Sequence, residues 1–527
     1  MKKLALKEHS LSRFAIILAT LVFVYLLVFK FPFTPLLNES DHHMFLYEGM
    51  RLFDGDAMYR DFFQFTFPGS QAWYWLMFSV FGAKYWILPA TIVLISGASV
   101  WVCLKVSSEI FTGKIYVIPA LLYIFFGFRY LGLDGAHRMF SPVFVMLAIF
   151  AVIKQRGMFG CILAGAFCAI ASFFTQQRGV LIVAAIGIFL VIDGLRTAKT
   201  KGTIARSIAV LTLSFTVVIT TLCCYFLIVA GPNNFIDATI VYPAKYYRYA
   251  IYNNFDVMVL DLTKALHITS PSKAFAALPA ILYLLVLPVC YLIFWTLFLL
   301  RKNRHGWEYW RNIMLIAISG SLLTFTNFAP NPSRLFQIAM PGLIIFVWLT
   351  VYFKDNARFS AAKFAMPALA SATILVVVLS FVQATRLQFT EFALMDTPTG
   401  RLAYIHAPII DQRYGWLLKR TSPGDYVFEA YQPYIYFPLR LRNPTKYGQI
   451  WDTDYTRPEH VTESIDALIA NPPRYILWNN DYNKAQETRS PGDHIGPLSQ
   501  YLQTHYKPAN EAVEIPEGKI QIWEKTD

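Results

Sequence analysis

Charged residues are scarce in this sequence, and their scarcity excludes an ordinary soluble protein. Only 15% of the 527 residues are Asp, Glu, Lys or Arg, whereas soluble domains carry about a quarter. Long apolar runs without any charge recur along the chain, as is typical of membrane-spanning helices. The sequence therefore predicts a polytopic membrane protein. No basic patch with a nucleic-acid motif is present, so we assign the net charge of +13 to Lys and Arg on cytoplasmic loops.

Cysteine is scarce as well, and its positions exclude a disulfide framework or a zinc site. All six cysteines lie inside apolar runs, and none lies in the polar loops or in the tail. Each is most simply a small buried hydrophobic residue. The sequence also has no internal repeat and no low-complexity segment.

Eleven apolar runs are the candidate membrane spans. They cover residues 14–29, 85–104, 115–128, 139–153, 158–175, 179–192, 207–230, 274–300, 312–328, 335–353 and 364–385. Some must extend past their uncharged cores, because a span needs roughly 17 to 25 residues. The first run precedes Phe31-Pro32-Phe33 rather than a small-residue cleavage site, so we expect an uncleaved helix with a cytoplasmic N-terminus.

The distribution of positive charge decides whether the ambiguous segment 71–81 crosses the membrane. If it does not cross, the loops rich in Lys and Arg lie inside, at 105–114, 154–156, 196–206, 301–311 and 354–363. We therefore predict an interfacial helix on the outer surface at 71–81. The outer segments are then 30–84, 132–138, 175–178, 231–273, 329–334 and the tail from Arg386.

The tail is less apolar and predicts a small α/β domain outside the membrane. Turn signals such as Ser422-Pro423-Gly424-Asp425 separate short strands at 425–430, 474–478 and 519–523 from helices at 460–470 and 496–505. The predicted fold is an all-α membrane domain of about eleven transmembrane helices, residues 1–385, followed by an extracytoplasmic α/β domain, residues 386–527.

Charge gathers at one face of the predicted membrane domain. The polar stretch 39–69 crowds acidic groups, two adjacent histidines and two arginines between apolar runs. The cores of the spans hold no ionisable residue, whereas ion-coupled transporters usually need such residues near the midplane. This pattern favours chemistry on a lipid headgroup, and ordinary loop charges are the alternative.

Several short motifs resemble a known group of enzymes. The motifs are YRDFF at 59–63, FPG at 67–69, SFFTQQRG at 172–179, PGDYVF at 423–428 and PRYIL at 473–477. With an acidic residue early in the first outer loop, they resemble the polyprenyl-phosphate-dependent glycosyltransferases of the GT-C fold. The nearest bacterial groups are the protein O-mannosyltransferases and the lipid A aminoarabinose transferases, and the resemblance spans most of the chain.

The resemblance implies transfer of one hexosyl or pentosyl unit from a polyprenyl-phosphate donor. The acceptor would be an envelope lipid, glycan or protein at the outer face of the bacterial inner membrane. The absence of a Walker A or GxGxxG-type loop fits a lipid-linked donor better than a nucleotide sugar. Two rivals remain, a transporter or flippase of a lipid-linked glycan and a non-catalytic assembly partner.

The resemblance also implies site residues. Asp41 matches the family's acidic residue, which deprotonates or orients the acceptor hydroxyl. This chain has Thr66 and Phe67 where related transferases often have Lys, and Arg138 near the position of a second Asp. The second acidic role is therefore assigned to Asp61 or Asp134. The candidates for binding the donor phosphate are cationic, namely Arg138, Arg178, Arg334, Lys245 and Arg248.

Each candidate has a simpler alternative. Asp41 suits a helix N-cap, Asp61 suits a surface pair with Arg60, and arginines at span ends reach lipid headgroups nonspecifically. The remaining substrate-binding candidates are Tyr59, Arg60, Tyr242, Tyr246 and Tyr247, and the tyrosines equally suit an aromatic belt. Asp41, His42 and His43 are a weak candidate for a divalent cation, because adjacent helical residues point about 100° apart.

Overall fold

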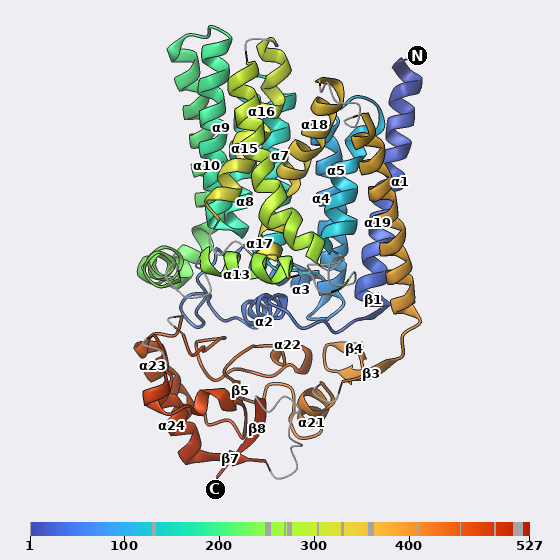
Figure 1. The fold of residues 1–527 in the computed structure, drawn as a ribbon. Coiled ribbons are helices and arrows are strands. Elements are labelled where there is room, and N and C mark those ends of the chain that lie inside the picture. Colours follow the sequence, from blue (N-terminus) through green and yellow to red (C-terminus); the bar gives the residue numbers. More distant parts are fainter. Residues whose placement is uncertain are drawn as a thin grey trace. The chain divides into compact units, whose positions relative to one another are not determined.

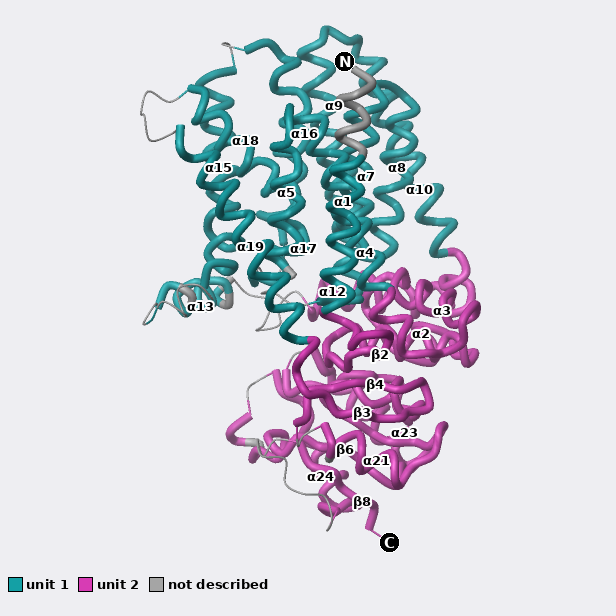
Figure 2. Tube along the Cα trace, turned by 90° about the vertical axis from the view of Figure 1, so that its right-hand side faces the viewer, with its two compact units in different colours: residues 1–26, 91–223, 254–387 teal, residues 27–90, 224–253, 388–527 magenta. Residues whose placement is uncertain are grey.

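The structure is a computed structural model that folds into two compact units. It describes residues 2–128, 133–247, 255–267, 270, 277–302, 305–327, 331–356, 363–407, 410–453, 455–489, 492–509 and 520–526. We name Met1–Leu26, Thr91–Cys223 and Asn254–Leu387 the helical unit. We name Leu27–Ala90, Cys224–Asn253 and Gln388–Asp527 the mixed unit (Figure 2).

The helical unit consists of helices that run side by side, with α7 packed on α8, α8 on α9 and α9 on α16 (Figure 1). Its helices are α1 (Lys2–Val28), α4 (Ile87–Ser107), η1 (Gly113–Val117), α5 (Ile118–Leu121), η2 (Leu122–Phe128), α7 (His137–Lys154), α8 (Met158–Phe174), α9 (Gln176–Arg196), α10 (Lys201–Ala230), α13 (Phe255–Leu266), η6 (Leu282–Val286), α15 (Leu287–Arg301), α16 (Trp307–Phe325), α17 (Pro332–Gln337), α18 (Met340–Asn356) and α19 (Ala365–Gln388).

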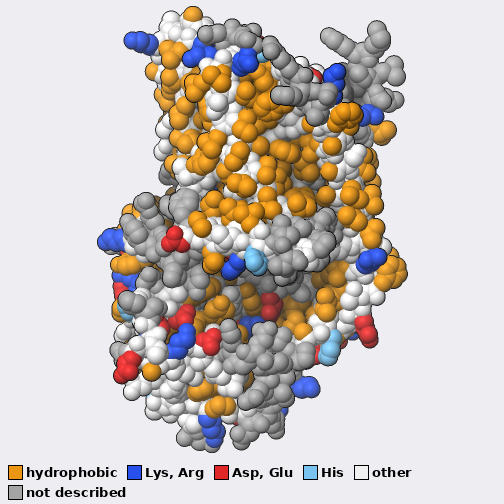
Figure 3. Space-filling model, viewed as in Figure 1, with side chains coloured by type: hydrophobic (Ala, Val, Ile, Leu, Met, Phe, Trp, Pro, Cys, Tyr) orange, Lys and Arg blue, Asp and Glu red, His pale blue; other side chains and the backbone are white. Residues whose placement is uncertain are grey.

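Seven helices in the described part of the chain are long and apolar enough to cross a membrane. They are Leu11–Val28, Ile87–Ser107, His137–Lys154, Gln176–Arg196, Lys201–Ala230, Ala277–Arg301 and Lys363–Gln388. Hydrophobic side chains cover much of the visible surface over these helices (Figure 3), and Leu213 and Ile374 are 65% and 63% exposed. Such exposure suits lipid rather than water.

The predicted number of eleven spans is not confirmed, although the other four predicted runs are also helical. Gly113–Gly127 and Met158–Phe174 are shorter apolar helices, and α16 covers the run at 312–328. The run at 335–353 is broken between α17 and α18. Pro341 lies at the start of α18, where its missing N–H costs no intrahelical bond.

The mixed unit combines the tail with two segments from earlier in the chain. Its elements are β1 (Phe29–Lys30), β2 (Thr34–Pro35), α2 (His42–Phe53), α3 (Gly69–Phe81), α11 (Pro232–Ile236), η3 (Asp237–Val241), α12 (Tyr242–Lys245), β3 (Phe392–Thr397), β4 (Gly400–Ile405), η8 (Asp411–Gly415), α21 (Trp416–Leu418), β5 (Val427–Glu429), α22 (Tyr436–Leu439), α23 (Pro458–Ala470), β6 (Tyr475–Asn479), η9 (Asn480–Asn483), η10 (Gln486–Thr488), α24 (Gly496–His505), β7 (Tyr506–Pro508) and β8 (Ile520–Lys525). Residues 27–90 and 224–253 thus fold with the tail rather than with the spans.

The tail forms a four-stranded sheet in the order β5-β6-β8-β7, with β5 parallel to β6 and the other pairs antiparallel. All five residues of β6 are buried, as expected for a central strand. Side chains of α23 and α24, including Leu468 and Leu502, pack against Phe428 and Trp478 in one core. The strands and helices predicted for the tail are therefore present, and only residue 519 of the last predicted strand lies outside the described residues.

Helix α3 covers the segment predicted to lie at the membrane interface. It has 13 residues, fewer than a span requires, and it ends at Gly82, whose φ of 73° few other residues adopt. Its partner is α2, which crosses it closely at Gly49. A Cβ on Gly49 would lie 2.5 Å from the Cβ of Tyr74. The interfacial location of α3 stays a prediction.

Candidate functional site

Asp41 occupies the N-cap position of α2, but its side chain does not cap the helix. Its backbone is helical (φ −49°, ψ −27°), and the carboxylate accepts no bond from the first-turn N–H groups. Backbone oxygens serve instead, because Ser40 O and Asp41 O accept from the N–H groups of His43 and Met44 at 3.0 and 3.1 Å. The capping alternative therefore does not account for the half-buried Asp41 carboxylate.

A buried arginine from the tail binds the segment just before Asp41. Arg413, on η8, is 4% exposed, and its Nη1 lies 3.2 Å from Oε1 of Glu39. The Nη2 of Arg413 donates to Oε1 of Glu429 on β5. Tyr414 also donates its hydroxyl to Oε1 of Glu39 at 2.6 Å. Two consecutive residues of η8 thus hold the Glu39 carboxylate.

The charges of three carboxylates act on Tyr434, and we name Glu39, Asp41 and Glu429 the acidic cluster. Burial raises the pKa of Tyr434, and the charges of Asp41, Glu39 and Glu429 raise it further. Arg413 lies over the Tyr434 ring at 5.4 Å. Burial raises the pKa of Glu429 to about 7 against the attraction of Arg413. The cluster carries more negative than positive charge, so it suits a group that donates a proton or a hydrogen bond.

The two histidines beside Asp41 are held by other groups. His42 contacts Ser40 Oγ through Nδ1 at 3.0 Å and the carbonyl oxygen of Asn38 through Nε2 at 2.7 Å. His43 contacts the Tyr85 hydroxyl at 3.0 Å, and burial lowers its pKa well below the usual value. Among the described residues, no three His, Cys, Asp or Glu side chains are grouped to hold a metal ion. The geometry gives no support to a cation shared by Asp41, His42 and His43.

The Asp61 carboxylate is hydrogen-bonded to neighbouring groups of its own turn. Its carboxylate accepts two bonds from Arg60, both at 2.9 Å, and one from the backbone N–H of Ala57 at 2.7 Å. Tyr59 is 1% exposed and donates its hydroxyl to the carbonyl oxygen of Thr66 at 2.8 Å. The structure thus favours the surface-pair interpretation of Arg60 and Asp61, and it places Tyr59 in the core.

The tyrosines of residues 242–247 join an aromatic cluster with the tail. Tyr242 is buried and donates its hydroxyl to the carbonyl oxygen of Tyr455 at 2.5 Å. Arg457 lies 4.2 Å from the Tyr246 ring centre. The half-buried Tyr247 contacts the Tyr455 ring at 5.3 Å. Lys245 is exposed at the end of α12, and Arg248 lies outside the described residues.

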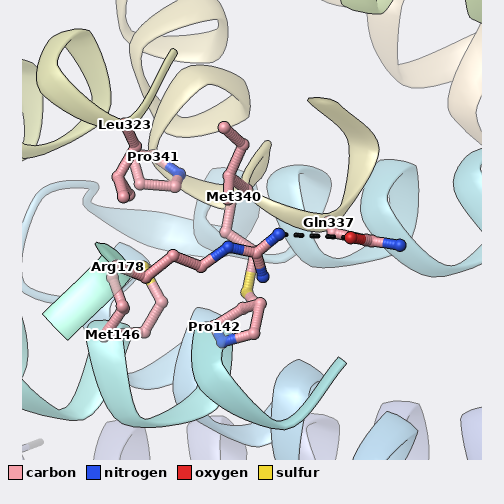
Figure 4. Close-up of a pocket in the computed structure, with 9 residues that line it drawn as sticks. Pro142, Met146, Arg178, Leu323, Gln337, Met340 and Pro341 are labelled. Carbon is pink, nitrogen blue, oxygen red and sulfur yellow. Dashed lines mark hydrogen bonds between the residues drawn. The ribbon is translucent and has the colours of Figure 1, made fainter. Parts of the chain in front are cut away.

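The helical unit holds a separate group of arginines around Arg178, at the start of α9. Arg178 is 7% exposed and donates to the carbonyl oxygen of Arg138 at 2.6 Å and to Ser141 Oγ at 2.9 Å. It also donates to Gln337 Oε1 at 3.2 Å (Figure 4). The charges of Arg138 and Arg334 both act on it. In the described part of the chain, no carboxylate pairs with Arg178. We name Arg138, Arg178 and Arg334 the basic cluster.

A buried guanidinium that bonds only to neutral oxygens attracts an anion. The pocket against Arg178, lined by Pro142, Met146 and Gln337 among others, has a free volume of about 10 Å³, room for roughly one water molecule. A phosphate therefore does not fit there. It would meet the basic cluster through the half-buried Arg138 and Arg334. Nearby, Asp134 accepts the backbone N–H of Ala136 at 2.9 Å and so supports the start of α7.

Comparison with known proteins identifies the fold. No protein-family model and no curated protein sequence matches the chain. Solved structures do match. ArnT from Cupriavidus metallidurans bound to undecaprenyl phosphate is 11% identical with a TM-score of 0.58, over 97% of this chain and 97% of that chain. The Archaeoglobus fulgidus oligosaccharyltransferase, in its complex with Zn and sulfate, is 12% identical with a TM-score of 0.54, over 93% and 71%. The chain has the GT-C fold.

In this GT-C chain, the motifs did not reveal the residues that bind Glu39, two positions before Asp41. Arg413 and Glu429 lie more than 370 residues beyond Glu39, and nothing in their local sequence sets them apart. The motifs also gave no sign of the environment of Glu48. It is buried in α2, accepts from Gln64 at 2.9 Å and from Gln71 at 2.7 Å, and has a pKa raised by burial to about 7. The only available signal was its position within the polar stretch 39–69.

Proposed function

We propose that the protein is an integral membrane glycosyltransferase of the GT-C type. It transfers one sugar from a polyprenyl-phosphate donor to a lipid, glycan or protein acceptor, at the outer face of the bacterial inner membrane. The observation that carries the proposal is the likeness to ArnT bound to undecaprenyl phosphate, which extends over 97% of both chains. The apolar helices in the described residues that are long enough to span a membrane, seven in number, are consistent with a lipid-linked substrate.

Asp41 is the general base in this proposal. The acceptor oxygen bonds to the anomeric carbon as the bond from that carbon to the donor phosphate breaks. The acceptor proton passes to the Asp41 carboxylate, and the bonding electron pair leaves with the polyprenyl phosphate. A carboxylate that is not used for capping, in a cluster of net negative charge, suits this role.

The basic cluster stabilises the leaving phosphate in this proposal. The charge that develops on the phosphate needs cations rather than an acid. The half-buried Arg138 and Arg334 would contact the phosphate, and the buried Arg178, fixed by three neutral oxygens, adds its charge from behind them. Lys245 and Arg248 are secondary candidates for the same phosphate.

The proposal is tested by mass spectrometry of the cell envelope. A strain lacking the gene is complemented with wild type, with Asp41→Asn or with Asp54→Asn, at matched expression. Asp54 is the matched control, because it lies at the other end of α2 and forms only a partly exposed pair with Arg440 at 3.4 Å. We expect one sugar to be missing from one envelope molecule in the deletion strain.

Wild type and Asp54→Asn should restore that sugar, whereas Asp41→Asn should lower it by roughly a hundredfold or more. Accumulated polyprenyl-phosphate sugar would identify the donor. Full restoration by Asp41→Asn would remove the base from the proposal. An unchanged envelope in the deletion strain would contradict the transferase function itself.

A further inference from the structure

Glu39 has the partly exposed carboxylate next to the buried ion pair of the acidic cluster. Its side chain is 25% exposed, whereas Glu429 is 2% exposed. Oε1 of Glu39 accepts from Tyr414 at 2.6 Å and from Arg413 at 3.2 Å. Oε2 has a single longer contact, 3.4 Å from Nη1 of Arg413. A carboxylate oxygen has two acceptor positions, so Oε2 retains capacity for a further donor.

We propose that Glu39 binds the acceptor hydroxyl as a second carboxylate beside Asp41, and that Arg413 is the positioning residue that holds it there. This inference rests on the proposed glycosyltransferase function and names the residue that orients the acceptor. An acceptor sugar or headgroup carries several hydroxyl groups. One carboxylate takes the proton of the reacting hydroxyl, and the second accepts a hydrogen bond and fixes the hydroxyl's direction.

Three other acidic residues of the polar stretch and the cluster are less suited to this role. Asp61 already accepts three hydrogen bonds from its own turn. Glu48 is 4% exposed and its carboxylate is covered by the amides of Gln64 and Gln71. Glu429 is buried against Arg413. Glu39 alone among these four is both partly exposed and fixed at one oxygen, two residues from Asp41.

Arg413 is built to position rather than to react. Its guanidinium is buried between Glu39 and Glu429 and lies over the ring of Tyr434. Glu429 is itself fixed in β5, where its backbone N–H donates to the Tyr436 hydroxyl at 2.8 Å. The chain of contacts runs from the sheet of the tail through Arg413 to Glu39. In this proposal, the α/β part of the mixed unit takes part in the reaction because it holds the Glu39 carboxylate in one geometry.

The test uses the full-length protein in lipid nanodiscs, with donor lipid extracted from the envelope and unmodified acceptor extracted from the deletion strain. Initial rates are measured against acceptor and against donor concentration for Glu39→Gln, Arg413→Lys and the double variant Arg413→Met/Glu429→Met. The double variant removes the ion pair as a whole, so no buried charge is left alone. The control is Asp396→Asn/Arg401→Met, which removes an exposed pair from the same unit.

We expect Glu39→Gln to lower kcat/KM for the acceptor roughly tenfold to a hundredfold. The KM for the donor should stay within about twofold of wild type. The double variant should also lower kcat/KM for the acceptor. The KM for the donor should again stay within about twofold of wild type. Arg413→Lys keeps the charge that binds Glu39, so it should lower kcat/KM for the acceptor less than the double variant does.

Two outcomes overturn the inference and leave the proposed function intact. One is a Glu39→Gln enzyme with wild-type kcat/KM while Asp41→Asn is inactive. The other is a double variant that impairs the use of donor and acceptor equally while Arg413→Lys is no more active, which is the behaviour of a purely structural pair. An absence of transfer by the wild type with any envelope acceptor would instead overturn the proposed function, and the inference with it.

Discussion

At the scale of the residue, Glu48 is a carboxyl group held in the core of the mixed unit. It receives N–H bonds from Gln64 and Gln71, yet burial outweighs them and raises its pKa from 4.5 to about 7. A raised pKa means that folding favours the protonated form. The folded protein therefore binds more protons than the unfolded chain between about pH 4.5 and 7, and its stability falls as the pH rises through this window.

Replacing Glu48 by Gln should remove this penalty. Gln71 Oε1 is buried without a partner among the described residues, so it is available to accept from the new amide after a flip of its own. We expect Glu48→Gln and wild type to unfold at similar temperatures at pH 4.5. The variant should become more stable by up to ~3 kcal/mol above pH 7. Thermal unfolding in detergent across this pH range measures the difference. A constant difference at all pH values would contradict the prediction.

At the scale of the element, the close crossing of α2 and α3 depends on one glycine. A Cβ at Gly49 would lie 2.5 Å from the Tyr74 Cβ and 3.3 Å from the carbonyl oxygen of Gln71. Neither atom is the end of a flexible side chain, so the helices themselves would have to separate. The crossing also sets the position of Glu48 and, through α2, of Asp41.

Gly49→Ala should therefore destabilise the protein although alanine is the better helix former. The propensity gain is about 1 kcal/mol, and the forced displacement costs about 1–3 kcal/mol, so we expect a net loss and lower transferase activity. Gly187→Ala in α9 is the control, because a Cβ there meets nothing within 4 Å. It should be neutral or stabilising. Equal melting temperatures for the two variants would show that α3 moves aside without cost.

The sequence predicted features that depend on a local pattern, but it did not predict contacts between residues far apart along the chain. Apolar runs predicted the helices, and alternation with turn residues predicted β5, β6 and α23, because these patterns lie within one element. The break between α17 and α18 was missed, since both halves are apolar. The motif made Asp41 a candidate, which stays a prediction. Arg413 contacts Glu39 across 374 residues of sequence, and only the folded structure brings such residues together.

At the scale of the whole molecule, ion pairs link the loops that positive charge assigned to the inner side. Lys154 lies 3.0 Å from Glu109, and Arg156 lies 2.8 Å from Glu308. These pairs join the predicted inner loops at 105–114, 154–156 and 301–311 within the helical unit. Two predicted outer loops, 30–84 and most of the described part of 231–273, instead fold with the tail in the mixed unit. The assignment of these segments to the two sides of the membrane stays a prediction from charge.

This topology predicts which positions a membrane-impermeant maleimide reaches. Five of the six cysteines are buried, and Cys224 lies within the apolar helix α10, so wild type should label weakly. Single cysteines are introduced at Asp396 and at Arg156, whose side chains are 74% and 62% exposed. In intact spheroplasts, Asp396→Cys should label strongly and Arg156→Cys should not. After permeabilisation both should label, because both are at the protein surface.

Labelling of Arg156→Cys alone in intact spheroplasts would invert the topology. It would place the mixed unit and Asp41 in the cytoplasm, and transfer at the outer face would then be impossible.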